Sequence, residues 1–219
     1  MAWLRAVRRH WLLYHLVDAR FSFLYDEPPA GEWIALDCET TGLDVRRDRI
    51  ISIGAVRIVG NRLLTGERLE LLVRPDKAPS AASVRVHRLR ERDVAGGIAI
   101  DEAIRRLLGF IGSRPIVGYY IEFDIAMLNR EIWPMLGVRL PQRQIEVSAM
   151  YYDYKNRKLP AHLRGGTIDL RFATMMNDLG LPIRGEHDAL SDAVMAGLAF
   201  LSLRSKSGGP GSLPARSGG

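Results

Sequence analysis

Apolar residues cluster in three short runs within the first third of the chain, and each run predicts a β-strand. The runs span residues 33–37, 49–59 and 68–73, and a hairpin turn is expected near Asn61 between the last two. Runs of this length that are rich in Ile and Val are typical of buried strands. A fourth, shorter strand is expected at residues 116–118.

Helical periodicity dominates the rest of the chain. Apolar residues recur every three or four positions after Asp101, along residues 123–134 and in a last helix along residues 190–201. This spacing places them on one face of a helix. Pro134 is expected to interrupt its helix, and a further capped helix is expected to carry Asp169 in its first turn.

The two ends of the chain differ from the part between them. Residues 1–20 interleave Trp and Leu with Arg and predict an amphipathic helix that packs on the domain or on a partner. We expect this helix to belong to an N-terminal helical extension of residues 1–32. Residues 204–219 are rich in Gly, Ser and Pro and are expected to form a disordered tail. The domain itself is expected at residues 33–203.

Composition and charge narrow the class of protein. With 219 residues, 47% of them hydrophobic and 26% charged, the chain suits one globular domain with a substantial core. The net charge of +6 is carried by the two ends, so it is weak support for a basic nucleic-acid cleft. A single cysteine, Cys38, excludes an internal disulfide and fits a cytoplasmic setting. No apolar stretch is long enough for stable membrane insertion.

Acidic residues lie where predicted strands end and helices begin. Asp37 and Glu39 are two positions apart, so a strand would direct both side chains to the same face. The two carboxylates repel each other, and a hard cation with oxygen ligands would relieve that repulsion. Asp124 follows the fourth strand, and His187 and Asp192 open the last helix. His187 with Asp188 also fits a helical metal phosphohydrolase, but the strand-rich first half of the chain disfavours that class.

In this order, the motifs resemble those of the DEDDh exonucleases. Residues 33–43 resemble the first family motif, residues 117–124 the second, and His187 with Asp192 the third. Within the family, the Asp-Cys-Glu-Thr-Thr-Gly-Leu segment and Val86–His87 are most similar to the epsilon proofreading subunit of bacterial DNA polymerase III and its free-standing relatives. The resemblance spans residues 33–203. It implies an α/β, ribonuclease-H-like fold with a central mixed β-sheet flanked by helices.

The resemblance also implies a metal-dependent 3′-to-5′ exonuclease that releases 5′-mononucleotides, with proofreading or repair as its role. Two divalent ions, Mg²⁺ or alternatively Mn²⁺, would be held by Asp37, Glu39, Asp124 and Asp192. His187 would take the proton from the attacking water. The last nucleotide would be seated by Glu39, Thr40, Phe123 and His87. The expected partner is a nucleic-acid 3′ end, DNA rather than RNA, and a replication or repair polymerase is a further candidate.

Several alternatives stay open on the sequence alone. An RNA-trimming exoribonuclease would use the same residues, and a non-catalytic nucleic-acid-binding module would retain the fold. Unused clustered anions are costly, which weighs against the binding module. Tyr119 and Tyr120 stand where many relatives have His-Asn. Their rings would either stack on a base or pack within the fold, and packing is the expectation. The sequence does not indicate the oligomeric state.

Overall fold

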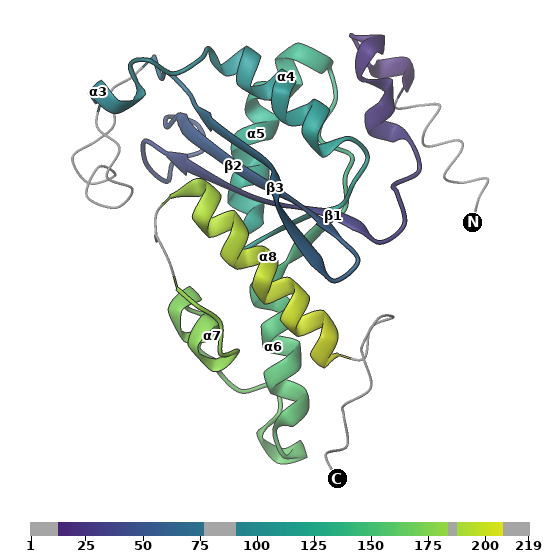
Figure 1. Ribbon diagram of the computed structural model, residues 1–219, viewed down its shortest axis with the longest axis vertical. Coiled ribbons are helices and arrows are strands. Elements are labelled where there is room, and N and C mark those ends of the chain that lie inside the picture. The colour runs from purple at the N-terminus through teal and green to yellow at the C-terminus, as the bar shows by residue number, and fades with distance from the viewer. Residues whose placement is uncertain (1–12, 77–90, 184–187, 208–219) are drawn as a thin grey trace.

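A five-stranded mixed sheet forms the centre of the protein (Figure 1). The computed structural model describes residues 13–76, 91–183 and 188–207. The strands follow the order β3-β2-β1-β4-β5, with β1, β2 and β3 antiparallel and β4 and β5 parallel to β1. Their bounds are β1 (Glu32–Thr40), β2 (Ile50–Val59), β3 (Arg62–Leu72), β4 (Ile116–Gly118) and β5 (Gln144–Glu146). The predicted α/β fold with a central mixed sheet is confirmed.

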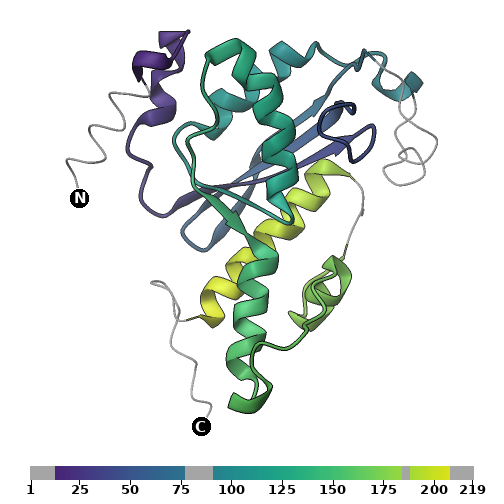
Figure 2. The same ribbon diagram turned by 180° about the vertical axis from the view of Figure 1, so that it is seen from behind.

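Helices cover both faces of this sheet (Figures 1 and 2). One face carries α4 (Ile100–Ile111) and α5 (Ile121–Leu136). The other carries α8 (Ala189–Lys206), with α6 (Val147–Lys158) and α7 (Phe172–Asp178) beside it and extending beyond the sheet. Three shorter helices complete the described elements: η1 (Ala19–Tyr25), α3 (Glu91–Val94) and η2 (Ala161–Leu163). None of the helices in the described residues is long and apolar enough to span a membrane.

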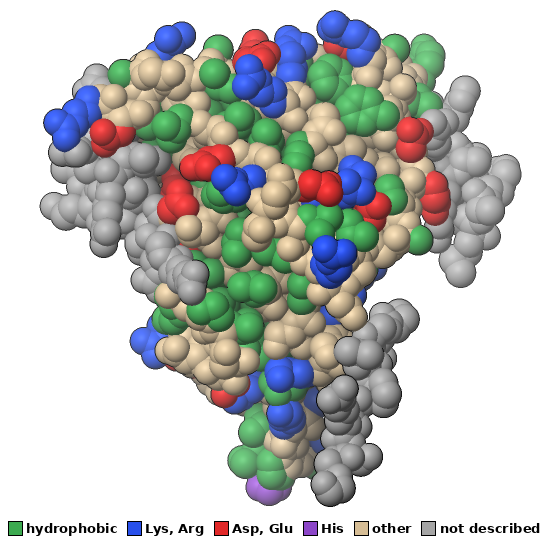
Figure 3. Space-filling view, in the orientation of Figure 1, with side chains coloured by type: hydrophobic (Ala, Val, Ile, Leu, Met, Phe, Trp, Pro, Cys, Tyr) green, Lys and Arg blue, Asp and Glu red, His purple; other side chains and the backbone are tan. Residues whose placement is uncertain are grey.

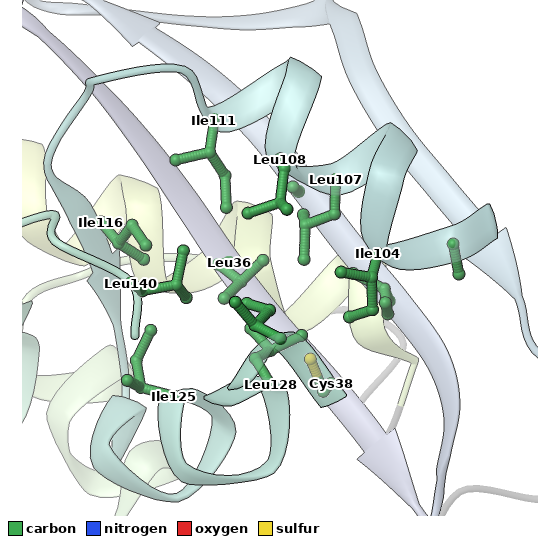
Figure 4. Close-up of a cluster of buried hydrophobic side chains, with 14 of the residues drawn as sticks. Leu36, Cys38, Ile104, Leu107, Leu108, Ile111, Ile116, Ile125, Leu128 and Leu140 are labelled. Carbon is green, nitrogen blue, oxygen red and sulfur yellow. The ribbon is translucent and has the colours of Figure 1, made fainter. Parts of the chain in front are cut away.

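Strand β1 separates two hydrophobic cores. Leu36 and Cys38 point into the core beneath α4 and α5, where they meet side chains such as Leu107 and Leu128 (Figure 4). Ala35 belongs to the core on the α8 side. Because side chains alternate along a strand, residues 37 and 39 point toward the α8 side. The first core therefore fixes the strand whose other face carries the two acidic residues.

Small residues allow α8 to approach the sheet closely. A Cβ atom added at Gly54 of β2 would lie 2.2 Å from backbone atoms of α8, and one added at Gly197 would lie 2.5 Å from the Leu63 side chain. The residues of α8 that are most buried include Ala193, Ala196 and Ala199. Leu190, Val194, Leu198 and Leu201 are only half-buried. The helix face of large apolar residues that the sequence suggested is thus not the face of α8 that packs most tightly against the sheet.

Figure 3 shows the face of the protein that α8 covers, with hydrophobic side chains gathered over this helix. Acidic and basic side chains are interspersed over the sheet on the same face. Among the residues that the structure describes, this face shows no large patch of a single charge, in line with the even charge balance of the middle of the chain.

Several element boundaries differ from those expected. β3 begins at Arg62 rather than at residue 68, because an edge strand needs only its ladder with β2 and not a buried apolar run. Pro134 lies inside α5, which continues to Leu136: the proline removes one backbone hydrogen bond of the helix close to its end but does not end it. α7 begins at Phe172, so Asp169 precedes it and instead accepts hydrogen bonds from Arg171 and Thr174.

The sequence did not lead us to expect β5 and α6, nor the short helices α3 and η2. β5 has only three residues, two of them polar. α6 buries Val147, Ser148 and Tyr151 and carries many polar residues without a continuous apolar stripe. Neither β5 nor α6 has the periodicity from which a helix or strand is predicted.

The chain ends also depart from the expected boundaries. Residues 1–12 and 208–219 lie outside the described residues. The helix expected through residue 20 does not continue that far: Asp18 accepts a hydrogen bond from the Arg20 backbone and starts η1. η1 buries Phe21 and Leu24 in the same core as β1. At the other end α8 continues to Lys206, because Arg204 stacks over the Trp33 ring at 4.3 Å and donates to the Gly60 carbonyl.

Candidate metal centre

Three carboxylates meet at the end of β1. Asp37 and Glu39 lie on the same side of that strand, and Asp192 reaches them from the first turn of α8. Each offers an oxygen atom that lies within 4.8 Å of the oxygens offered by the other two. The close approach of α8 to β2 thus brings together residues that are more than 150 positions apart in the chain.

Asp124 adds a fourth carboxylate, from α5 on the face of the sheet opposite to α8. It lies in the first turn of α5, is only 4% exposed, and accepts a hydrogen bond from the Cys38 backbone amide at 3.0 Å. Cys38 stands between Asp37 and Glu39, so this bond fixes Asp124 against the strand that carries both. The β1–β2 register shifts between Glu39 and Thr40, and such irregularities often re-aim side chains beside active sites.

The electrostatics show that these acids are held in an unfavourable arrangement. Burial, and next the charges of Asp124 and Asp192, raise the pKa of Asp37 well above its usual value. Burial and the charge of Asp192 raise the pKa of Glu39 to about 7. Burial raises the pKa of Asp124 to about 8. Among the described residues no Lys or Arg forms an ion pair with Asp37, Glu39 or Asp124, so a bound cation would relieve an electrostatic cost.

The chemistry of the donors fits a hard divalent cation. The cluster offers only carboxylate oxygens, which suit Mg²⁺, Ca²⁺ and Mn²⁺, whereas zinc favours nitrogen and sulfur ligands. The nearby thiol of Cys38 points into the other core, and burial raises its pKa well above the usual value. Cys38 is therefore a neutral packing residue and no ligand.

Comparison with known proteins assigns this arrangement to a family. The family model described as exonuclease matches residues 34–200, which include all four carboxylates. The chain belongs to the exonuclease family. The resemblance predicted from the sequence is thereby confirmed.

Several similar proteins carry the names of DNA polymerase III proteins. The DNA polymerase III subunit epsilon-like protein of Rhodobacter capsulatus is 32% identical over 78% of this chain and 23% of its own length. The DNA polymerase III PolC-type protein of Thermotoga maritima is 29% identical over 81% of this chain, which spans only 12% of that relative. The DNA polymerase III subunit epsilon of Aquifex aeolicus is 24% identical over 79% of this chain and 80% of its own length.

Solved exonuclease structures share the fold. A zinc-bound complex of Escherichia coli ExoI with single-stranded DNA aligns with a TM-score of 0.66 at 18% identity, covering 82% of this chain and 41% of the other. Exonuclease X in complex with 5′ overhanging duplex DNA aligns with a TM-score of 0.61 at 22% identity, covering 82% and 95%.

The Thr-Thr-Gly segment that follows the acidic pair shapes the β1–β2 loop of this family member. Thr40 is buried and donates to the Gly42 carbonyl at 2.7 Å, and Thr41 donates to Asp48 at 3.0 Å. A Cβ atom at Gly42 would lie 2.5 Å from the Asp48 carboxylate, so a side chain there would displace the group to which Thr41 donates. The loop is therefore tied back to the end of β1, where Glu39 lies.

The other predicted site residues have different outcomes. Phe123 is half-buried and packs against the core beneath α5, directly before Asp124. His87 and His187 lie outside the described residues, so their predicted roles stay predictions. Tyr119 packs within the fold, whereas Tyr120 is exposed.

Two residues near the site were not singled out as site residues from the sequence. Asp188 caps α8 by accepting from the Ser191 amide, and its charge adds to the causes that raise the pKa values of Asp37 and Glu39. The Glu146 carboxylate accepts from the backbone amides of Tyr120 and Ile121 and so holds the start of α5. The three-residue spacing from Asp188 to Ser191 is a usual capping pattern, but Glu146 gives no comparable local signal.

Proposed function

We propose that the protein is a metal-dependent exonuclease that hydrolyses DNA from its 3′ end and releases 5′-mononucleotides. The observation that carries this proposal is the convergence of Asp37, Glu39 and Asp192 on one point, with Asp124 fixed against the same strand. In an exonuclease-family fold, four clustered carboxylates, three of which have raised pKa values, are best explained as ligands for metal ions that take part in the reaction.

The proposed metals are two divalent ions, Mg²⁺ in the first place and Mn²⁺ as a substitute. Asp37, Glu39 and Asp192 would hold one ion, and Asp124 would hold the second together with Asp37. When bound, such a pair activates a water molecule for attack and stabilises the oxygen that leaves. Because Asp124 is buried and Asp37 is half-buried, solvent screens their charges only in part, and bound ions would compensate most of the rest.

Other residues would position the substrate and move the proton. His187 would accept the proton of the attacking water, since imidazole has a reference pKa of about 6.5, near working pH. Glu39 and the backbone at Thr40 would meet the terminal 3′-hydroxyl. Phe123 and His87 would seat the last nucleotide. These roles come from the family motifs of the sequence.

DNA is the proposed substrate because of what the similar proteins are. Relatives carry the names of DNA polymerase III components, and similar solved structures hold single-stranded or overhanging duplex DNA. On the same ground we propose a replication or repair polymerase as a partner. RNA trimming is the competing activity. The cytoplasmic setting suggested by the single cysteine stays a prediction.

The polarity of degradation tests this proposal. Single-stranded DNA labelled at its 5′ end should give a ladder of progressively shorter labelled products when Mg²⁺ is added, and no ladder with a chelator. A mismatched duplex and an RNA of the same sequence, run in parallel, rank the substrates. Asp37→Asn should give no ladder, whereas Asp153→Asn, which alters an exposed acid on α6, should behave as the wild type. Immediate release of the 5′ label as a mononucleotide would contradict 3′-to-5′ polarity.

A further inference from the structure

Tyr120 has an unusual backbone conformation for so large a residue. Its φ of 51° and ψ of 35° place it in the left-handed region, and it is the only residue other than glycine with positive φ in the described part of the chain. Bulky residues rarely adopt this region because Cβ is crowded by the following carbonyl. Such conformations persist where the surrounding structure holds them, and they are frequent at functional sites.

Hydrogen bonds to Glu146 and a ring contact with Tyr119 hold this conformation. The Glu146 carboxylate of β5 accepts hydrogen bonds from the Tyr120 amide at 3.0 Å and the Ile121 amide at 2.9 Å. The Tyr119 ring lies against the Tyr120 ring, with 4.5 Å between centroids. Tyr119 is itself fixed, because its ring packs on Phe172 at 4.6 Å and its hydroxyl donates to the Leu170 carbonyl at 2.8 Å. The Tyr120 ring is thus backed by an anchored aromatic pair.

The ring nevertheless contributes little to the core. Tyr120 is 57% exposed, while Tyr119 is half-buried and belongs to the hydrophobic cluster on the α8 side. Packing therefore accounts for Tyr119 but leaves one part of Tyr120 open to solvent. The open ring stands one helical turn before Asp124, at the start of the helix that carries this carboxylate.

We propose that the open face of the Tyr120 ring is a binding site for a nucleobase of the strand whose end lies at the carboxylates. The proposal rests on the proposed function. Stacking on an aromatic ring is tolerant of base identity, because every base has a π-face. A base can reach the ring only when it is unstacked from its neighbours, so the ligand is an unpaired strand end. The hydroxyl of Tyr120 is not needed for stacking.

The matched variants separate stacking from a structural role. Tyr120→Phe keeps the ring, and Tyr120→Gly removes it while relieving the left-handed strain. We expect the glycine variant to melt within a few degrees of the wild type, since the relief of strain offsets the lost ring contact. Trp133→Ala is the control, because Trp133 is a 55% exposed aromatic residue on the same helix.

The direct readout is the fluorescence of 2-aminopurine, placed in turn at each position near the 3′ end of a single-stranded oligonucleotide with phosphorothioate linkages. Wild type, Tyr120→Phe and Trp133→Ala should quench the fluorescence strongly at one position. Tyr120→Gly should lose that quenching and raise KM by roughly 5- to 100-fold, with a much smaller change in kcat.

Two results would overturn the inference. One is a Tyr120→Gly variant that keeps both the quenching and the wild-type KM. The other is a wild type that degrades DNA but quenches no position more than Tyr120→Gly does. Tyr120-dependent quenching without any hydrolysis by the wild type would instead contradict the exonuclease proposal and leave the stacking site standing.

Discussion

Strand β1 carries acidic residues at both of its ends, and the protein treats them in opposite ways. Near the start, Glu32 accepts hydrogen bonds from Arg57 at 2.9 Å and Arg114 at 2.6 Å, and these bonds lower the pKa of its carboxyl group. Near the end, burial and neighbouring acids raise the pKa values of Asp37 and Glu39. At the Glu32 end, two arginines of the protein neutralise the carboxylate. At the Asp37–Glu39 end, the neighbouring charged groups named among the described residues are further acids.

This contrast indicates what each end does. Glu32, Arg57 and Arg114 join β1 to β2 and to the residues before β4, so this end acts as a clamp on the sheet. The carboxylate end costs stability as it stands and is useful only if a cation binds there. Substitutions at the carboxylate end of β1 should therefore reduce activity without loss of stability, and substitutions at the Glu32 end should reduce stability without loss of activity.

The largest effect is expected from Asp37→Asn. We expect Mg²⁺-dependent hydrolysis to fall by roughly 10,000-fold, because metal-assisted charge stabilisation is worth several kcal/mol. The melting temperature of the metal-free protein should rise, since one of the repelling charges is gone. Single-turnover cleavage and calorimetry measure the two effects. Near-normal cleavage by this variant would show that Asp37 is no metal ligand.

His187→Ala should come next in size. A general base typically contributes about 100- to 10,000-fold, so single-turnover cleavage should slow by that factor while metal and DNA still bind. The rise of the wild-type rate with pH through the histidine range should largely disappear. A wild-type rate with an unchanged pH profile in this variant would leave the reaction without its predicted base.

Glu32→Gln tests the clamp. Loss of its charge should lower the free energy of unfolding by about 1 to 3 kcal/mol, since hydrogen bonds to charged groups are stronger than neutral ones. Activity should not change. Glu67→Gln is the control, because Glu67 also bonds to Arg57 but is half-exposed, and such pairs contribute about 1 kcal/mol or less. Equal effects of the two substitutions would mean that Glu32 is an ordinary surface acid.

The smallest effect concerns pH. Glu39 has a raised pKa, so its contribution to stability is present below its usual value near 4.5 and is lost as pH rises through about 7. Glu32 has a lowered pKa, so its contribution is present at higher pH and is lost on acidification. Without metal, the free energy of unfolding should therefore fall by on the order of 1 kcal/mol between about pH 5 and pH 8. The raised pKa values of Asp37 and Asp124 add to the same fall, so Glu39→Gln should reduce this slope without removing it. A slope unchanged in that variant would argue against the assigned shift.

Much of the site could be predicted because its signals are local. Asp37 and Glu39 stand two positions apart at the end of an apolar run, and Asp124 follows a short strand. Each of these signals can be recognised from its own short segment of sequence. The order of the motifs then indicated the family. Asp124 and Asp192 are brought to β1 by crossovers that the sequence does not display, but the family resemblance supplied that geometry.

The rest could not be predicted because it depends on contacts between distant segments. Glu146 acts through backbone amides of another element, and a carboxylate in a three-residue strand gives no sign of such a role. Many of the most buried residues of α8 are alanines, which apolar periodicity marks poorly, so the periodicity pointed to residues that are only half-buried. Tyr119 and Tyr120 are adjacent and identical, and only the fold separates the packed ring from the open one.

The central claim is that the carboxylate end of β1 is built for a divalent cation. The most direct measurement is the melting temperature of the wild type and of Asp37→Asn near pH 8, each with a chelator and with saturating Mg²⁺. Binding to the native state alone stabilises a protein, by more than 1 kcal/mol at about tenfold excess over Kd. We expect Mg²⁺ to raise the melting temperature of the wild type clearly. Asp37→Asn should be more stable than the wild type without metal and should gain little from Mg²⁺. Equal Mg²⁺ responses in the two proteins, or none in the wild type, would contradict the claim.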